Sequence, residues 1–393
     1  MKPWPTVRLG EVLRHRKEFI TIDDLTTYKR PRVQIHVQGI VQRDEVPGAL
    51  IKTKTQQVCR TGEFLVAEID AKVGGFGIVP KSLNGSIVSS HYFLFVVDES
   101  KLNLRFLDYF IRTPTFREQV AAQGSTNYAA IRPAHVLGYE IPLPPLAEQR
   151  RVVARIEELA AQIHEARTLR HQAAEEAEAL FEASVGKRLS ELSNCPTDKL
   201  AALTTKIGSG STPAGGRAVY PTSGIPFIRS MNVRMRRFQW DDIAFISSDT
   251  HKQMSGTRVR PRDVLLNITG ASIGRVACAP SDLQEANVNQ HVAIIRPKQE
   301  VEPSFLMYWL SQPAIQDFIN DEQKGATRQG FTKAQIQAFD IPLPPVPEQR
   351  RIVAELDALQ AEVDALKRLQ AETAKELDAL LPAILDRAFK GEL

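Results

Sequence analysis

The stretches IPLPPLAEQR at 141–150 and IPLPPVPEQR at 341–350 are identical at eight of ten positions and begin 200 residues apart. The chain has 393 residues, so this offset is close to half its length. A matching pair at such a distance predicts a tandem duplication, in which each copy contributes the same local structure. The Pro-Pro pair in each stretch favours extended backbone before it, so an element should begin just afterwards.

Two long helices are predicted after these stretches. Apolar or small residues recur there with a mean spacing of 3.5, the period of a left-handed coiled coil. They are Val152, Ile156, Leu159, Ile163, Ala166, Leu169, Ala173, Ala177 and Leu180, and then Ile352, Leu356, Leu359, Val363, Leu366, Leu369, Thr373, Leu377 and Leu380. Antiparallel packing within the chain would bury both stripes, and pairing between two chains is the alternative. Pro382 is expected to end or kink the second helix.

The segments upstream of the two helices also match. At the same offset, residues 62–91 and 262–291 share Leu, Ala, Gly, Pro, Val and His positions, and apolar runs such as FLVAEI and VLLNIT read as strands between turns. We therefore expect an α+β protein in which two mixed α/β domains in tandem repeat are joined by two long antiparallel coiled-coil helices. The expected boundaries are 1–145, 146–188, 189–345 and 346–393.

Composition limits the function classes. The chain is 43% hydrophobic and 24% charged, as in a globular protein, and it has neither an apolar run of about 20 residues nor a signal peptide. We expect a cytoplasmic protein without a membrane partner. Cys59, Cys195 and Cys278 form no metal or disulfide pattern and are read as free thiols.

Basic charge is concentrated in the two predicted domains. Residues 1–140 hold 19 Lys and Arg against 14 Asp and Glu, and residues 201–297 hold 12 against 6. The second helix, 346–389, is acidic, with 6 against 9. This distribution favours a polyanion as the ligand of the domains.

The paired junction motif, together with TGASIG at 269–274, NVNQH at 287–291 and IPFIRSMNV at 225–233, resembles the specificity subunit of Type I restriction-modification systems. The resemblance covers essentially the whole chain. It implies two target recognition domains that each read one half of a bipartite double-stranded DNA site, with the helices as spacer. It also implies docked methyltransferase subunits, restriction-translocase subunits that join through the complex, and no catalysis or cofactor in this chain. The two junctions predict two methyltransferase copies per chain.

Arg, Asn and Gln side chains that can meet bases and phosphates gather in RSMNVRMRRFQW, in the second domain. They are Arg229, Asn232, Arg234, Arg236, Arg237 and Gln239. A solvated surface strand is the alternative for this cluster. The loop NITGASIGR adds Thr269, Ser272 and Arg275, for which an ordinary hairpin turn is the alternative, and the following segment adds Asn289 and Gln290.

The candidates in the first domain are more diffuse. They are Lys52, Lys54, Lys72 and Ser89. A polar glycine loop in each domain adds further candidates, Ser125 and Asn127 in the first and Arg328 and Gln329 in the second. His91 and His291 occupy matching positions between variable neighbours, which favours a structural role for both.

The residues around each helix start are candidates for docking the methyltransferase. They are Pro144, Pro145, Glu148, Gln149 and Arg150, and Pro344, Pro345, Glu348, Gln349 and Arg350. Glutamate suits a helix N-terminus, whereas arginine there opposes the helix dipole. A well-started helix is the alternative explanation.

Two other functions remain open on sequence alone. A coiled-coil adaptor whose domains bind proteins is the runner-up. Glu68, Asp70 and Lys72 have the spacing of a metal-dependent nuclease site, but the second copy reads ITGAS at the matching position. The glycine-rich GSGSTPAGG lacks the GK[ST] of a phosphate-binding loop.

Overall fold

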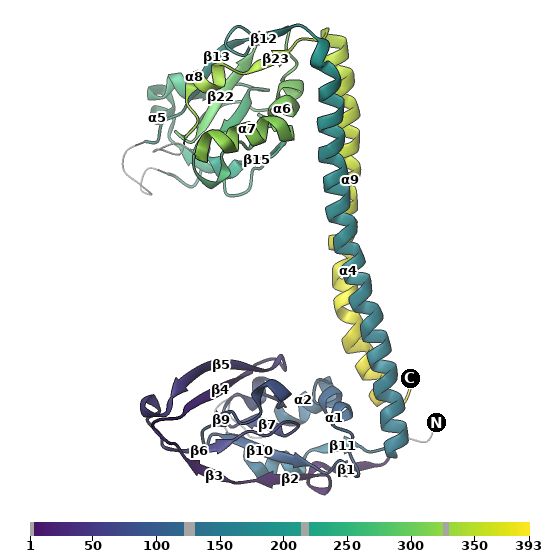
Figure 1. Ribbon diagram of the computed structural model, residues 1–393. Helices are drawn as coiled ribbons and strands as arrows, with labels where there is room; N and C mark the ends of the chain where they lie inside the picture. Colours follow the sequence, from purple (N-terminus) through teal and green to yellow (C-terminus); the bar gives the residue numbers. More distant parts are fainter. Residues whose placement is uncertain (1–3, 122–129, 214–219, 325–329) are drawn as a thin grey trace. The chain divides into compact units, whose positions relative to one another are not determined.

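The chain folds into two compact units. The computed structural model describes residues 4–121, 130–213, 220–324 and 330–393. Unit 1 consists of 1–170 and 371–393, and unit 2 consists of 171–370 (Figure 1). In the described part of the chain, no helix is long and apolar enough to cross a membrane.

Both long helices predicted from the repeat are present. They are α4, Leu146–Ser190, and α9, Val346–Phe389. Within unit 1, Arg167 pairs with Asp378 at 2.6 Å and Arg170 donates to Thr373 at 2.5 Å. The residue number rises along one helix as it falls along the other, so these segments run antiparallel.

The same direction holds within unit 2. Glu178 pairs with Lys367, and Arg188 reaches Glu355 at 2.9 Å. The predicted antiparallel coiled-coil helices are thus confirmed in each unit (Figure 1).

Pro382 was expected to end or kink the second helix, and the expectation that it ends the helix is wrong. The helix continues through Pro382 to Phe389. Proline removes one backbone hydrogen bond, but the turns beyond it bury Leu385 and Ala388 in the core of unit 1 and pack Phe389 against it. Apolar burial of this size offsets the lost bond.

Unit 1 is built on a four-stranded antiparallel sheet of order β2-β10-β7-β8, a three-stranded sheet of order β3-β6-β9, and the pairs β1–β11 and β4–β5. The strands are β1 Thr6–Arg8, β2 Leu13–Arg16, β3 Phe19–Thr21, β4 Thr27–Gln34, β5 Gly39–Pro47, β6 Thr55–Val58, β7 Phe64–Ala67, β8 Phe76–Ile78, β9 Ile87–Val88, β10 Tyr92–Val97 and β11 Glu140–Pro142. Its helices are α1 Leu104–Phe110, α2 Pro114–Ala121 and α3 Pro133–Gly138.

Unit 2 repeats this plan. Its main sheet has the order β13-β22-β19-β20, its second sheet the order β17-β14-β21-β18, and its pairs are β12–β23 and β15–β16. The strands are β12 Thr197–Lys199, β13 Thr204–Ser209, β14 Ile225–Ile228, β15 Val233–Arg234, β16 Arg237–Phe238, β17 Ala244–Ile246, β18 Arg258–Val259, β19 Val264–Asn267, β20 Val276–Cys278, β21 Ala286–Val288, β22 Val292–Pro297 and β23 Asp340–Pro342. The helices are α5 Ser248–Gln253, α6 Pro303–Ser311, α7 Pro313–Lys324 and α8 Lys333–Gln337.

The main sheets of the two units, β2-β10-β7-β8 and β13-β22-β19-β20, correspond strand for strand, as the duplication predicts. Strands β7, β8 and β10 occupy the places of β19, β20 and β22, and the matched strands pair in the same directions. The second sheets share β6–β9 and β18–β21, but unit 1 adds a strand outside β6, whereas unit 2 adds two outside β21. The repeats therefore differ at the edges of a common framework.

Each core is completed by both long helices. In unit 2, Phe181 and Val185 of α4 are buried with Ile352 and Leu356 of α9. In unit 1, Ile156 of α4 is buried in the cluster that receives the end of α9. The two helices are therefore part of each domain core, and the expected α+β architecture is confirmed.

Candidate nucleic-acid interface

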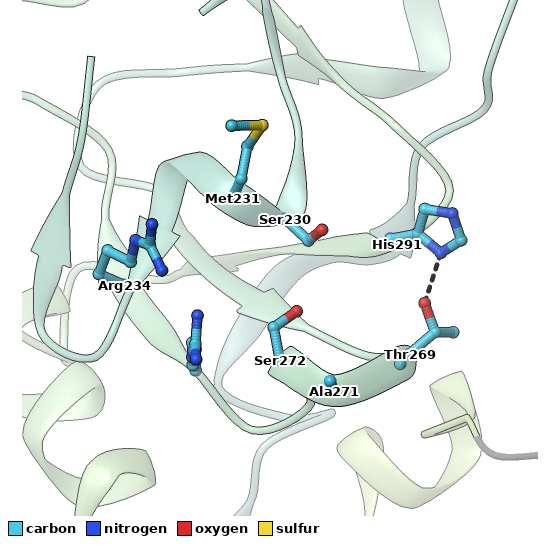
Figure 2. Close-up of a pocket in the computed structure, with 9 residues that line it drawn as sticks. Ser230, Met231, Arg234, Thr269, Ala271, Ser272 and His291 are labelled. Carbon is cyan, nitrogen blue, oxygen red and sulfur yellow. Dashed lines mark hydrogen bonds between the residues drawn. The ribbon is translucent and has the colours of Figure 1, made fainter. Parts of the chain in front are cut away.

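An open hollow of about 430 Å³ lies on unit 2 where several predicted residues meet. It is lined by Ser230, Met231, Arg234, Thr269, Gly270, Ala271, Ser272, Arg275 and His291. Figure 2 shows Arg234 on one side, the Thr269–His291 pair on the other, and Ser230 and Ser272 between them. The structure thus brings Arg234, Thr269, Ser272 and Arg275 together from separate segments.

The lining is basic and polar. Arg234 and Arg275 bring two guanidinium groups, and none of the described residues that line the hollow carries a carboxylate. Gly270 has a φ of +73°, a conformation that glycine adopts without strain. Such a surface matches a phosphate or the acceptor edge of a base.

Polar contacts link the residues on the His291 side of the hollow. His291 Nδ1 bonds Thr269 Oγ1, and His291 Nε2 lies 3.0 Å from the amide nitrogen of Gln290. Gln290 in turn contacts Thr212. These contacts fix the His291 ring beside Thr269 at the edge of the hollow.

The matching place in unit 1 contains a carboxylate. There His91 Nδ1 lies 2.7 Å from Glu68, whose other oxygen binds Arg132. The backbone is unchanged, because Glu68 N–H bonds the His91 carbonyl just as Ile268 N–H bonds that of His291. The two histidines therefore have matching places and different partners.

Arg234 is oriented by its own hairpin. Its Nε donates to the Gln239 side-chain oxygen at 3.0 Å, and the Gln239 amide donates to Asp241 at 2.8 Å. Gln239 thus positions the arginine, while Arg237 is exposed on β16.

Asn232 and Arg236 are corrections to the predicted DNA contacts. Asn232 is fully buried, and its amide donates to the carbonyls of Gln239 and Asp241. The Arg236 side chain is only 5% exposed, because it pairs with Glu182 on α4 and lies over the Phe181 ring. Neither side chain is accessible to a duplex in this structure.

Three other predicted residues are partly or wholly engaged by the protein. Asn289 is buried and accepts from the His291 N–H, which corrects its assignment as a DNA contact. Arg229 donates to the Asp242 carbonyl at 2.5 Å. Ser89 accepts from the His91 N–H at 3.4 Å, a turn contact.

The lysines of unit 1 do not converge on one site. Lys54 binds Asp24 and the Gly48 carbonyl, Lys52 is exposed, and Lys72 lines a separate hollow with Arg117. The remaining candidates, Ser125, Asn127, Arg328 and Gln329, lie outside the described residues.

The repeated glutamine of the first junction has a structural role. Gln149 is fully buried at the start of α4. Its side-chain oxygen accepts from the Asn103 N–H at 2.7 Å, and its amide donates to the carbonyls of Lys101 and Pro144 at 2.9 and 2.8 Å. One side chain thus ties the helix start to the domain.

Gln349 repeats these contacts in unit 2. It accepts from the Glu302 N–H at 2.8 Å and donates to the carbonyls of Glu300 and Pro344, both at 2.9 Å. The buried glutamines and the buried prolines, Pro144 and Pro344, are therefore not surface docking residues, which corrects that part of the prediction.

The charged residues of the junctions remain on the surface. Glu148 receives two hydrogen bonds from Arg151, at 2.8 and 2.7 Å, while Arg150 is exposed. These bonds hold the pKa of Glu148 below its ordinary value. The pair accounts for one of the two arginines that oppose the dipole.

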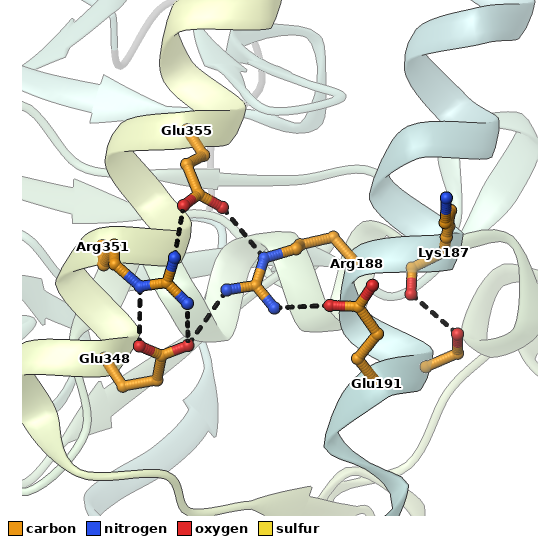
Figure 3. A network of polar contacts seen from close by, with 7 residues as sticks. Lys187, Arg188, Glu191, Glu348, Arg351 and Glu355 are labelled. Carbon is orange, nitrogen blue, oxygen red and sulfur yellow. Dashed lines mark hydrogen bonds and ion pairs between the residues drawn. The ribbon is translucent and has the colours of Figure 1, made fainter.

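The second junction adds a cross-helix network (Figure 3). Glu348 accepts from Arg351 at 2.7 and 2.8 Å and from Arg188 of α4 at 3.0 Å, and Arg188 also binds Glu191 and Glu355. Arg351 and then Arg188 lower the pKa of Glu348 to about 2. Position 388, which matches Arg188, is alanine, so the junctions differ in charge.

The proposed metal-nuclease motif is engaged otherwise. Both oxygens of Glu68 are taken, by His91 and by Arg132. In the residues that the structure describes, no group of three or more His, Cys, Asp or Glu side chains could hold a metal ion.

Residues that sequence reasoning missed include Ser230 and Met231. They line the hollow, although their neighbours in the same segment were predicted. Their position in the sequence could have indicated this, because they directly precede the hairpin that packs beside the loop of Thr269 and Arg275.

The comparisons with known proteins agree with this architecture. Residues 1–170 and 206–374 match the Type I restriction modification DNA specificity domain. The specificity subunit of the Type I restriction enzyme EcoBI of Escherichia coli is 27% identical over 76% of this chain and 67% of its own length. That of EcoKI, from Escherichia coli strain K12, is 22% identical over 73% of this chain and 65% of its own length.

Solved structures resemble the whole chain. One, from a study of complex assembly and conformational transition of the type I R-M system, has a TM-score of 0.71 and 29% identity, and covers 100% of this chain and 99% of its own. The HsdS subunit from Thermoanaerobacter tengcongensis has a TM-score of 0.63 and 28% identity, over 100% and 98% of the two chains. The family match spans well over half of the sequence, so the chain belongs to the Type I restriction-modification DNA specificity family.

Proposed function

We propose that this chain is the non-catalytic DNA-recognition subunit of a Type I restriction-modification complex. Each unit reads one half of a bipartite double-stranded DNA site, with the domain boundaries expected from the sequence. Because the ligand is DNA, the chain works in the cytoplasm. The observation that carries the proposal is the basic hollow of unit 2, which lies within a framework shared by both units while its side chains are not shared.

The chemistry of the hollow fits a duplex better than a protein surface. Arg234 and Arg275 meet there with no carboxylate among the described lining residues, and Ser230 and Ser272 add hydroxyl donors. Guanidinium groups pair with phosphate oxygens or with the O6 and N7 of guanine. Where unit 1 has Glu68, unit 2 has Ile268, so the second reader is the more open to a polyanion.

The methyltransferase partners are assigned to the helix starts, one at each junction. The surface residues there are Glu148 and Arg150 in the first copy and Glu348 and Arg350 in the second. Restriction subunits would then join through the assembled complex. Arg150→Ala with Arg350→Ala is expected to lower co-purification of methyltransferase, whereas Arg155→Ala, further along α4, should not. Equal recovery from both variants would contradict docking at these arginines.

The function itself is tested by modified-base sequencing of the host genome with and without the gene. Loss of methylation from a single gapped, two-part motif is the expected result. Two results together would overturn the proposal. One is a purified complex with methyltransferase that binds no DNA sequence in preference to others, and the other is an unchanged methylome. In that case a protein-binding adaptor would explain the fold better.

A further inference from the structure

The two units carry very different hairpins at the same place. In unit 2 the hairpin β15–β16 has two residues in each strand and packs against β20. In unit 1 the hairpin β4–β5 has strands of eight and nine residues and packs against β8, the strand that matches β20 (Figure 1). Both turns contain a non-glycine residue with a φ of 59°, His36 and Arg236. The hairpins therefore pack on matching strands, and they differ in length and in their turns, since Val37 beside His36 also has a positive φ.

One face of the unit 1 hairpin is fixed and the other is open. Val33 and Ile40 form a cross-strand pair and are buried in a small core cluster. The adjacent pair, Arg32 and Val41, is exposed, as is Lys29 nearer the base. We call this hairpin the ribbon (27–47). One face of it packs on the domain through Val33 and Ile40, and the face that carries Arg32 and Val41 is exposed.

The acidic residues of the ribbon are already paired. Arg30 binds Asp44 through two hydrogen bonds of 2.7 Å. Arg43 adds a third bond of 3.1 Å to Asp44, and Lys29 lies 3.7 Å from Glu45. These pairs neutralise both carboxylates of the ribbon.

Arg32 has no such partner. Among the ion pairs and hydrogen bonds of the described residues, none involves its side chain. The exposed amide of Gln38 lies in the turn of the same hairpin, and the Val41 methyl groups are opposite Arg32. Gln42 is exposed too, but it pairs with Pro31 and so lies on the alternate face. A free guanidinium, an amide and methyl groups are the side-chain chemistry that distinguishes guanine, adenine and thymine in the major groove.

We propose that unit 1 reads its half-site with the open face of the ribbon laid in the major groove of DNA, with Arg32 as the guanine-reading side chain. The major groove is about 12 Å wide and accepts a two-stranded β-ribbon. Unit 2, whose hairpin is cut to two residue pairs, reads instead through its hollow. This inference rests on the proposed function and adds the element and the residue that carry specificity in unit 1.

The test uses the assembled complex with its methyltransferase subunits and a randomised duplex library, from which bound DNA is sequenced. Arg32→Ala is expected to reduce base preference within one half-site by about 10-fold or more and to leave the other half-site unchanged. Arg32→Lys keeps the charge but not the two-pronged donor, so it should lose the same preference while keeping most of the overall affinity. The matched control is Arg14→Ala, an exposed arginine on β2, at the opposite edge of the main sheet.

The outcomes separate this inference from the function on which it rests. If the unaltered complex selects a two-part site and Arg32→Ala selects the same site, the ribbon inference fails alone. If Arg32→Ala weakens all sequences equally, Arg32 meets phosphate and the base-reading role is overturned. If Arg32→Ala loses methyltransferase, the ribbon is a protein surface. A complex that selects no sequence removes both the function and the inference.

Discussion

The two units fasten their domains to the long helices with different side chains. In unit 2, Tyr308 of α6 donates directly to Asp357 of α9 at 2.7 Å. In unit 1, Arg105 stands between the equivalent groups and donates to both Tyr109 and Glu157 at 3.0 Å. The glutamine ties at the junctions, by contrast, are the same in both units. Contacts that start the helices are kept, and contacts further along have been replaced.

The largest effect is expected from the shared glutamine. Gln349→Ala leaves one buried N–H and two carbonyls without their partner, and an unsatisfied buried group costs about 1–3 kcal/mol. The unfolding free energy of unit 2 should fall by about 3 kcal/mol or more, and Gln149→Ala should do the same in unit 1. Urea unfolding with hydrogen exchange would measure and locate the loss. Gln162→Ala, exposed on α4, is the control, and an equally small effect at all three positions would contradict the structural role.

The next effect concerns the hollow. Arg234→Ala in the assembled complex is expected to lower affinity for the cognate duplex by about 10- to 100-fold, because a good arginine–base pair contributes about 1–3 kcal/mol. Titrations at several salt concentrations sharpen the assignment, since loss of a phosphate contact lowers the salt slope by about 0.9. Arg260→Ala, exposed elsewhere on unit 2, should change neither quantity. Unchanged binding by Arg234→Ala would remove the hollow from the DNA interface.

A smaller change is expected from Arg236, which binds α4. Removing one partner of a buried ion pair costs several kcal/mol, but Glu182 is 34% exposed, so solvent reduces the cost to about 1–2 kcal/mol. Arg236→Met should therefore destabilise unit 2 and leave sequence selection intact, whereas Arg237→Met should leave stability unchanged. Thermal melting measures the stability of both variants, and selection from a duplex library measures their sequence preference. Loss of selection at full stability would restore Arg236 as a DNA contact.

The smallest effect is a pH dependence at the second junction. Glu348 has a folded pKa of about 2 against an ordinary 4.5, so its ion pairs stabilise the fold above about pH 4.5 and this contribution is lost as the pH falls toward 2. Arg188→Met removes one of its two arginines and should raise the pKa of Glu348, but not that of Glu148. Carboxyl NMR titration would show both. A Glu348 midpoint that does not move would mean that Arg351 alone lowers its pKa.

The helices and the repeat could be predicted because their signals are local and periodic. The 3.5-residue spacing and the 200-residue offset give the two helices, whereas their antiparallel pairing within one chain was one of two expectations. Side-chain destinations are different. Arg236 was predicted to face DNA because its neighbours are basic, yet its partner Glu182 lies 54 residues earlier in the chain. No local pattern records such a contact.

The ribbon was missed for a related reason. Pro31 interrupts the run TYKRPRVQ and weakens its reading as a strand, and the structure accommodates it at a β-bulge. The glutamines were misassigned because conservation between the repeats fits a docking role and a buried tie equally well. Only burial separates the two explanations, and burial depends on the folded domain.

The end of α9 affects the order in which the two units can fold during synthesis. Phe389 packs against Phe106 and Phe110, with ring centroids 4.8 and 5.2 Å apart, inside the core of unit 1. Domains generally fold as they leave the ribosome, the N-terminal one first. Here the first domain made must wait for residues near 389, whereas unit 2 is contiguous and can finish earlier. We therefore expect the nascent chain to carry an open apolar face through most of translation, and unit 1 to depend more on chaperones than unit 2.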